Sequence, residues 1–378
     1  MNLLNIFRKI ALLFGILFVI AVFIYLFALI IIHSSTDIKI VVTYISFLIS
    51  AILFITVVYR FENFQSSKWI YACLAVLSFA YQIILSSNVP FNGEGDLQFN
   101  FSNAVSLASN HFTDLNSKFY CATFPGTITY PAVLSVFMKL FGINRMVPVL
   151  LNHMMICILV CAIYTFLKTR MSIIWALSGS LLFALHPFTI IYSNTYNAEL
   201  IYGTFVMFSF FAFMKVNTST KIRSQVTWIA LVALFCGISI LFRPLSIIMI
   251  IAFIIYIVFF TFDRYIKKLL FIAVLVSVFA LCGFANNALV KTLTSYNPPS
   301  SSFGWNLYVG ASATGRYNED DAKEFGKVSI GSSSPTEIQK HFASEAIIRY
   351  KNIGSDIFIR GFRKLEPWLS YEYIANET

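Results

Sequence analysis

The sequence predicts an all-α polytopic membrane protein, and three observations carry this prediction. Hydrophobic residues make up 58% of the 378 residues and charged residues only 12%, against roughly 25% charged in soluble proteins. The mean hydropathy is +0.77. Apolar runs of about 20 residues recur along the chain, and each is long enough to cross a bilayer core as a helix that satisfies its own backbone hydrogen bonds.

Nine apolar runs are predicted to span the membrane. The first follows Arg8 and Lys9 and is too long for the core of a signal peptide, so it is interpreted as a retained span. The predicted spans cover residues 10–32, 40–59, 69–85, 146–167, 173–191, 200–216, 226–242, 245–262 and 269–284. They divide the chain into N-terminal transmembrane helices at 1–86, a large outer loop with juxtamembrane helices at 87–145, a transmembrane bundle at 146–286 and an outward-facing tail at 287–378.

The distribution of Lys and Arg predicts the orientation of these spans. One side of the nine-span arrangement carries Arg8, Lys9, Arg60, Lys68, Lys168, Arg170, Lys215, Lys221, Arg223, Arg264, Lys267 and Lys268. The positive-inside rule places that side in the cytoplasm. The N-terminus is then inside, and the 87–145 loop and the tail are outside. The net charge of +10 comes mainly from these connections, so it does not indicate binding to nucleic acid.

A few cations fall on the outer side, where the rule predicts depletion. Arg243 stands between two apolar runs, and Lys139 and Arg145 flank the end of the outer loop. Long cationic side chains often snorkel to the interface and anchor helices there. The alternative is that they bind a lipid-linked phosphate at the outer leaflet through charge-assisted hydrogen bonds. Both interpretations stay open for each of the three residues.

Neither a disulfide framework nor a metal cluster is predicted. All cysteines except Cys121 lie in apolar spans, where a thiol packs as a small hydrophobe, and Cys121 has no partner in the loops. Cys157 and Cys161 share a helical face, but no His or carboxylate joins them, which favours core packing. His111 and His341 lack the spacing of metal ligands.

The tail has helix signals of its own. Ser334-Pro335-Thr336-Glu337 is a capping box with proline at the first helical position, and Gly354 supplies a stop. Between them an apolar stripe recurs every four residues, at Ile338, Phe342, Ala346 and Tyr350. Residues 357–368 form a second amphipathic segment, expected on the membrane surface. The acidic run at 319–321 is interpreted as a solvated turn, and His186-Pro187 as a helix terminator.

Two carboxylates in the outer loop are the candidate catalytic groups. Glu94 and Asp96 stand one residue apart, are flanked by glycines and follow an apolar span closely. Ionisable groups at such depth are costly and are functional by default. Partial desolvation also raises the basicity of a carboxylate. The pattern therefore predicts a general base or a ligand of a divalent cation, against the common alternative of two solvated turn residues.

The order of motifs resembles a known group of enzymes. Glu94-x-Asp96 follows a span, Phe124-Pro125-Gly126 forms an aromatic-Pro-Gly turn, and Lys139-Leu140-Phe141-Gly142 precedes the next span. This order is similar to that of the GT-C superfamily of membrane glycosyltransferases, particularly bacterial relatives of the protein O-mannosyltransferases (glycosyltransferase family 39). The segment from Ser193 to Glu199 fits the place of a second acidic residue. Gly304-Trp305, with the acidic cluster that ends at Asp321, resembles the tail pattern of the group.

The resemblance implies an activity and a set of partners. Asp96 would be the catalytic base, Glu94 would position it or bind a divalent ion, and Glu199 would be the second acidic site. Arg243, with Lys139 and Arg145, would bind the donor phosphate. The enzyme would move a sugar from a polyprenyl-phosphate-linked donor to a hydroxyl of a protein, glycan or lipid acceptor. It would act among the membrane lipids, at the outer face of a bacterial cytoplasmic membrane.

Two departures from the group keep alternatives open. Gly95 separates the two carboxylates, which are often adjacent in relatives, so metal dependence stays open. Relatives usually continue through further spans after the tail, whereas this sequence stops at Thr378. An inactive, truncated membrane scaffold is therefore one alternative. A transporter or flippase of lipid-linked sugar is another; it should show polar residues at mid-membrane and an internal repeat.

Overall fold

The computed structural model describes residues 49, 51–55, 68–86, 95–261, 264–300, 302–312 and 318–353. All regular secondary structure within these ranges is helical, which confirms the predicted all-α, membrane-type fold. Several predicted features lie outside the described residues, namely the span at 10–32, most of the span at 40–59, Glu94, Gly354 and the segment at 357–368.

Four described helices are long and apolar enough to cross a membrane, α8 (Met146–Lys168), α11 (Glu199–Thr218), α12 (Ile222–Phe242) and α14 (Tyr265–Thr294). Other predicted spans correspond to shorter apolar helices, α4 (Trp69–Ser86), α9 (Ile173–Leu185) and α13 (Ser246–Tyr256), the last continued by the π-helical turn η1 (Ile257–Thr261). A fifth span results if α6 (Leu115–Thr123) and α7 (Gly126–Phe141) count as one broken helix. The predicted number of nine spans is therefore not confirmed.

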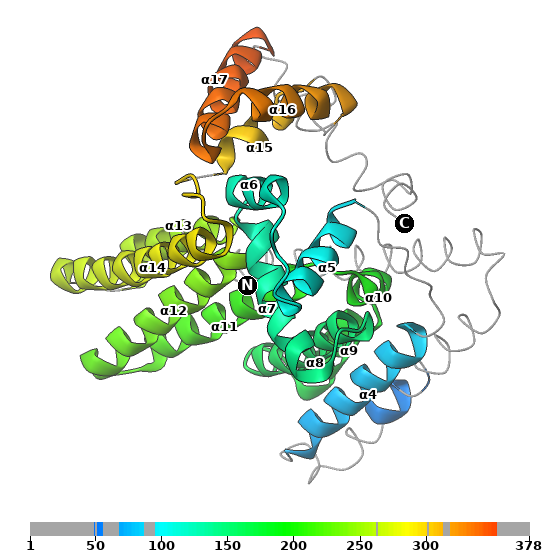
Figure 1. The fold of residues 1–378 in the computed structure, drawn as a ribbon. Coiled ribbons are helices and arrows are strands. Elements are labelled where there is room, and N and C mark those ends of the chain that lie inside the picture. Colours follow the sequence, from blue (N-terminus) through cyan, green and yellow to red (C-terminus); the bar gives the residue numbers. More distant parts are fainter. Residues whose placement is uncertain are drawn as a thin grey trace. The chain divides into compact units, whose positions relative to one another are not determined.

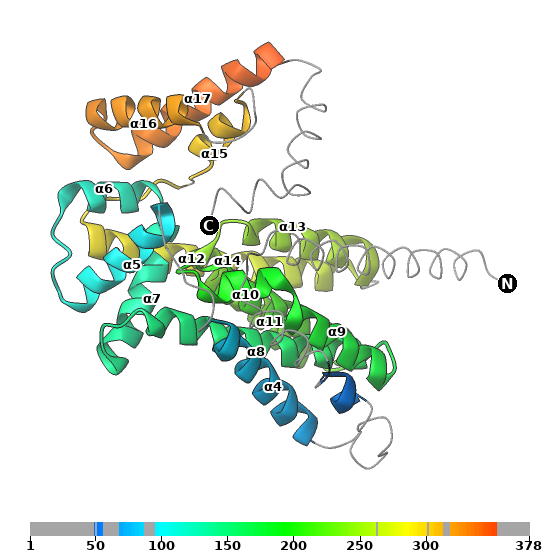
Figure 2. The same ribbon diagram turned by 90° about the vertical axis from the view of Figure 1, so that its right-hand side faces the viewer.

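The chain divides into two compact units, and the first comprises residues 1–90 and 149–195. Here α4, α9 and most of α8 pack with the short α10 (Pro187–Asn194) (Figure 2). Gln82 on α4 donates its side-chain N–H to the Ala184 carbonyl of α9 at 3.1 Å. The predicted terminator is confirmed, because α9 ends just before His186 and Pro187 opens α10.

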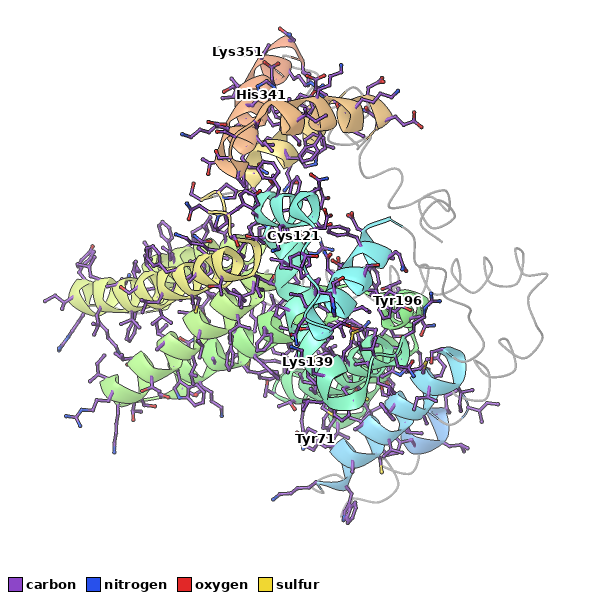
Figure 3. The ribbon with its side chains drawn as sticks, in the orientation of Figure 1. Tyr71, Cys121, Lys139, Tyr196, His341 and Lys351 are labelled. Atoms are coloured by element: carbon purple, nitrogen blue, oxygen red, sulfur yellow. The ribbon has the colours of Figure 1, made fainter. Side chains whose placement is uncertain are left out.

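The cysteines behave as the sequence predicts. All six are free thiols. In the first unit, the thiols of Cys157 and Cys161 on α8 donate to the backbone carbonyls of Ala75 and Tyr71, at 3.4 and 3.7 Å (Tyr71 is labelled in Figure 3). They therefore pack two neighbouring helices together.

The second unit comprises residues 91–148 and 196–378, and its apolar core lies between α11, α12, α13 and α14 (Figure 1). The rings of Phe213 and Phe253 approach to 4.6 Å, and Phe271 is fully buried. Helices α12 and α14 meet at Gly237, where an added Cβ would lie 2.4 Å from the sulfur of Cys282. The predicted spans therefore pack as a bundle.

From Gly95 onward, the stretch expected to be a polar outer loop is largely helical. It holds α5 (Gly95–Ala108) and the bent pair α6 and α7, whose axes turn by 111° at Phe124-Pro125. Asp114 caps α6 by accepting hydrogen bonds from the backbone of Asn116 and Ser117, the latter at 3.0 Å. The Ser117 hydroxyl also donates to Asp114, at 2.6 Å, and this bond together with the backbone bonds holds the pKa of Asp114 below its usual value. Cys121 lies buried among α5, α6, α7 and α14 (Figure 3).

The tail folds into α15 (Phe303–Gly310), α16 (Glu319–Gly331) and α17 (Pro335–Ile353), shown in yellow to red in Figure 1. The predicted helix is confirmed: Pro335 begins α17, and the Glu337 N–H donates to Ser334 Oγ. Three residues of the predicted apolar stripe, Ile338, Phe342 and Ala346, are fully buried. They contact Trp305 and Tyr308 of α15, so the stripe is the core of this small helical cluster.

One prediction for the tail is wrong. The acidic run at 319–321 is the first turn of α16, and Asp321 is buried. Its carboxylate accepts from Arg349 at 3.0 Å and from the side-chain amide of Asn318 at 3.0 Å. Acidic side chains are favoured at helix N-termini by the exposed N–H groups there. The cation that permits burial comes from α17, which the sequence of the run alone does not reveal.

Candidate active site

Asp96 stands in the first turn of α5 and is exposed. The preceding Gly95 has φ +58°, a left-handed conformation that glycine adopts without strain, and it starts the helix. Asp96 thus stands at the start of a helix and not in the loop that the sequence predicts.

The next turn of α5 contacts the segment before α11. Asn100 donates its side-chain N–H to the Tyr196 carbonyl at 3.1 Å, and the ring of Phe101 stacks on that of Tyr196 at 4.8 Å (Tyr196 is labelled in Figure 3). Residues four apart on a helix share a face, so Asp96 lies one turn along the face that Asn100 presents to this segment. Glu199 follows Tyr196 by three residues.

The structure joins two candidate residues that the sequence treated separately. Glu199 opens α11 and Arg243 follows the last residue of α12. Because a short connection joins these packed helices, the start of α11 lies beside the end of α12. There Arg243 forms an ion pair with Oε1 of Glu199. Their side chains are 48% and 34% exposed, so the pair is open to a ligand from solvent or membrane surface.

The start of α7 packs against the same end of α12. The Thr129 hydroxyl donates to the Leu241 carbonyl, and a Cβ at Gly126 would lie 3.2 Å from the Phe242 carbonyl oxygen. The glycine of the Phe-Pro-Gly turn therefore permits this close approach. One turn further on, Tyr130 is completely buried and interacts electrostatically with Glu199.

The other two predicted phosphate-binding cations have different surroundings. Lys139 donates to the side-chain oxygen of Asn110 at 3.0 Å, near the opposite end of α7 (Figure 3). Lys139 lies thirteen positions after Gly126 along α7, which corresponds to about 20 Å. Arg145 lies in the turn before α8 and interacts electrostatically with Tyr196. Arg145 thus interacts with the segment that α5 contacts, whereas Lys139 lies apart from it.

Sequence reasoning missed Tyr130, Tyr196 and Asn100. None of them carries a charge, and each acquires its place only through packing between α5, α7 and α11. The one available signal was Gly126, since a glycine just after Phe-Pro often marks a close backbone approach.

A metal at this site stays a prediction. Among the described residues, no three His, Cys, Asp or Glu side chains converge as ligands. Asp96 supplies a single carboxylate, and Glu94 lies outside the described ranges. These observations leave the predicted divalent cation untested.

Comparison with known protein families gives a match over part of the chain. Residues 126–289 match the model of the family described as dolichyl-phosphate-mannose-protein mannosyltransferase. No curated protein and no solved structure gives a significant match. The matched segment runs from the start of α7 into α14 and contains Tyr130, Glu199 and Arg243, while Asp96 precedes it. Over this segment the chain is similar to the mannosyltransferase family, which confirms its resemblance to membrane glycosyltransferases of the GT-C type.

Proposed function

We propose that this chain transfers a sugar from a polyprenyl-phosphate-linked donor to an acceptor hydroxyl at the outer face of a bacterial cytoplasmic membrane. The observation that carries this proposal is the Glu199–Arg243 pair, which lies within the segment matched by the mannosyltransferase family. A guanidinium held by a carboxylate at the end of an apolar helix suits a phosphate whose lipid chain remains in the membrane.

In the proposed reaction, the acceptor oxygen forms a bond to the anomeric carbon as the bond from that carbon to the phosphate oxygen breaks. Asp96 takes the proton of the acceptor hydroxyl as general base. The polyprenyl phosphate leaves as an anion, and Arg243 stabilises the charge that develops on it. Glu199 holds the guanidinium in place, so its geometry is fixed before the donor binds. Glu94 would position Asp96 or hold a divalent ion.

The role of Asp96 is tested by Asp96→Asn, which keeps the shape of the side chain but removes proton acceptance. We expect sugar transfer to slow by a factor of about 10²–10⁴, the usual contribution of general-base catalysis. Donor binding should survive, because the proposed phosphate ligand is elsewhere. The measurements are single-turnover transfer and equilibrium donor binding by the purified protein.

Asp114→Asn is the matched control for this experiment. It also changes a carboxylate in the helical region that follows Gly95, and asparagine caps a helix as well as aspartate, so α6 and the transfer rate should persist. Near-normal turnover by folded, donor-binding Asp96→Asn protein would refute the catalytic role. A flippase would give a different result, with lipid-linked sugar transport retained in the same variant.

The role of Arg243 is tested through donor affinity. A hydrogen bond to a charged group contributes about 1.5–3 kcal/mol, so Arg243→Ala should weaken binding of a polyprenyl-phosphate sugar about tenfold or more. Lys139→Ala is the comparison, since Lys139 lies about 20 Å along α7 from the close contact with α12. If Lys139→Ala weakens donor binding tenfold or more while Arg243→Ala leaves it unchanged, the phosphate site lies at the other end of α7.

A further inference from the structure

Two buried polar atoms in the region of Arg243 have no hydrogen-bond partner among the described residues. The hydroxyl of Tyr130 on α7 is fully enclosed and makes no hydrogen bond to the described residues. Oε2 of Glu199 on α11 is likewise out of contact with solvent and without a partner, although Oε1 of the same carboxylate pairs with Arg243. Both groups lie at the same end of α12, because Tyr130 follows Thr129, whose hydroxyl donates to the Leu241 carbonyl, and Glu199 pairs with Arg243. Tyr130 and Glu199 also interact electrostatically.

Such a pair is energetically unfavourable as it stands. Leaving one buried donor or acceptor unsatisfied costs about 1–3 kcal/mol, and folded proteins keep few of them. The phenol of Tyr130 has an O–H to donate, whereas an ionised carboxylate such as Glu199 only accepts. One group that both accepts and donates satisfies both atoms at once. A hydroxyl does this.

The hydroxyl has three potential sources: water, the acceptor, or the sugar of the donor. Position decides among them. Glu199 uses its other oxygen to hold Arg243, the proposed ligand of the donor phosphate. A hydroxyl bound to Oε2 is therefore separated from that phosphate only by the Glu199 carboxylate and the Arg243 guanidinium. The donor sugar is the group covalently attached to the phosphate, so its hydroxyls are the ones within reach.

We propose that Tyr130 and Glu199 form a subsite that binds one hydroxyl of the donor sugar, with Tyr130 donating to it and Glu199 accepting from it. This inference rests on the proposed function and adds a determinant of sugar specificity to it. A site whose buried polar groups are matched to a substrate hydroxyl discriminates against the analogue that lacks it, because the protein groups are then left unpaired.

The test compares two ligands. One is a polyprenyl phosphate carrying mannose and the other is the same polyprenyl phosphate without sugar. Tyr130→Phe removes a single hydroxyl and should weaken binding of the mannosylated lipid roughly threefold to tenfold, the range for one neutral hydrogen bond. Binding of the sugar-free lipid should be unchanged. Tyr164→Phe is the matched control, since Tyr164 in the first unit is also fully buried with an unpartnered hydroxyl.

Donor analogues lacking one sugar hydroxyl complete the test. The unmodified protein should bind one analogue of the series more weakly than the intact donor, and Tyr130→Phe should reduce that difference. This part does not depend on the folding of the variant: a series in which the unmodified protein distinguishes no analogue overturns the inference.

The remaining outcomes separate the inference from the proposed function. If Tyr130→Phe weakens both lipids equally, or neither, the subsite is absent while the donor site stands. A lower unfolding temperature with unchanged binding of both lipids identifies a structural water as the occupant and overturns the inference. A rise confined to the KM of the acceptor assigns the hydroxyl to the acceptor instead. If the unmodified protein binds neither lipid, the proposed function itself fails.

Discussion

Asp96, Glu199 and Asp321 share one local setting, the first turn of a helix, yet they have three different environments. Asp96 is exposed and has no ion pair among the described residues. Glu199 pairs with Arg243 at a half-open position, and Asp321 pairs with Arg349 in the core of the tail. A helix start favours a carboxylate in each case, so local sequence does not distinguish a structural carboxylate from one with a role in binding or catalysis. The paired cation and the degree of burial distinguish them.

The buried pair gives a stability prediction at the scale of residues. Arg349→Met removes the cation but keeps much of the packing over Tyr308, whose ring centre lies 3.4 Å from the guanidinium carbon. The side chain of Asp321 is 3% exposed and would lose its charge partner. We expect the free energy of unfolding to fall by about 2–3 kcal/mol, which is below the usual cost of breaking a fully buried pair because Arg349 is partly exposed. A thermal unfolding experiment measures this change.

Lys323→Met is the control for this variant. Lys323 pairs with Glu319 and Asp320, whose side chains are almost fully exposed, and exposed pairs contribute about 0–1 kcal/mol. Equal shifts of the unfolding midpoint in the two variants would contradict the assignment of Asp321 and Arg349 as the structural pair.

At the scale of helices, α17 links the tail to the bent pair α6 and α7. The side chain of Gln339 accepts from the backbone N–H of Trp305 at 3.1 Å and donates to the Thr123 carbonyl at 3.3 Å. Thr123 ends α6, directly before the turn that sets Gly126 against α12. The tail thus contacts the segment that positions the start of α7.

Docking of α15 on α17 depends on Gly304. A Cβ at this position would lie 2.0 Å from the Gln339 carbonyl oxygen, a backbone atom with little room to move. Gly304→Ala should therefore force the helices apart, destabilise the tail by roughly 1–3 kcal/mol and raise amide hydrogen exchange in α15 and α17.

Gly326→Ala in α16 is the matched control, because an added Cβ there meets no atom within 4 Å. Alanine is the better helix former by up to about 1 kcal/mol, so exchange should stay the same or slow. Faster exchange in both variants would mean that the contact at Gly304 is not the cause.

The same scale shows what the sequence could predict. Long apolar runs predicted α8, α11 and α12 to within a few residues, since hydropathy alone determines such helices. Helices α5 and α6 were expected as loop, because their polar residues resemble those of loops. Packing against α7 and α14, together with the Asp114 cap on α6, stabilises them as helices. The pairing of Glu199 with Arg243, 44 residues apart, likewise depends on how α11 and α12 meet.

At the scale of the molecule, the candidate site and the tail of the second unit both lie at one end of α12. Arg243 ends this helix, the start of α7 packs beside it, and α17 reaches that region through Thr123. Lys221, which precedes α12, lies at the other end, 21 residues or about 31 Å away. If α12 spans a membrane, the site and the tail face one side of it and Lys221 the other.

The last prediction tests which side is which. In a cysteine-free background, Lys323→Cys on α16 and Lys221→Cys before α12 each place one thiol at an exposed position. The positive-inside rule places Lys221 in the cytoplasm. An impermeant thiol reagent should therefore label Lys323→Cys in intact cells and Lys221→Cys only after permeabilisation. The reverse pattern would place Asp96 and Arg243 on the cytoplasmic side, and the donor would then have to be a lipid-linked sugar of the inner leaflet.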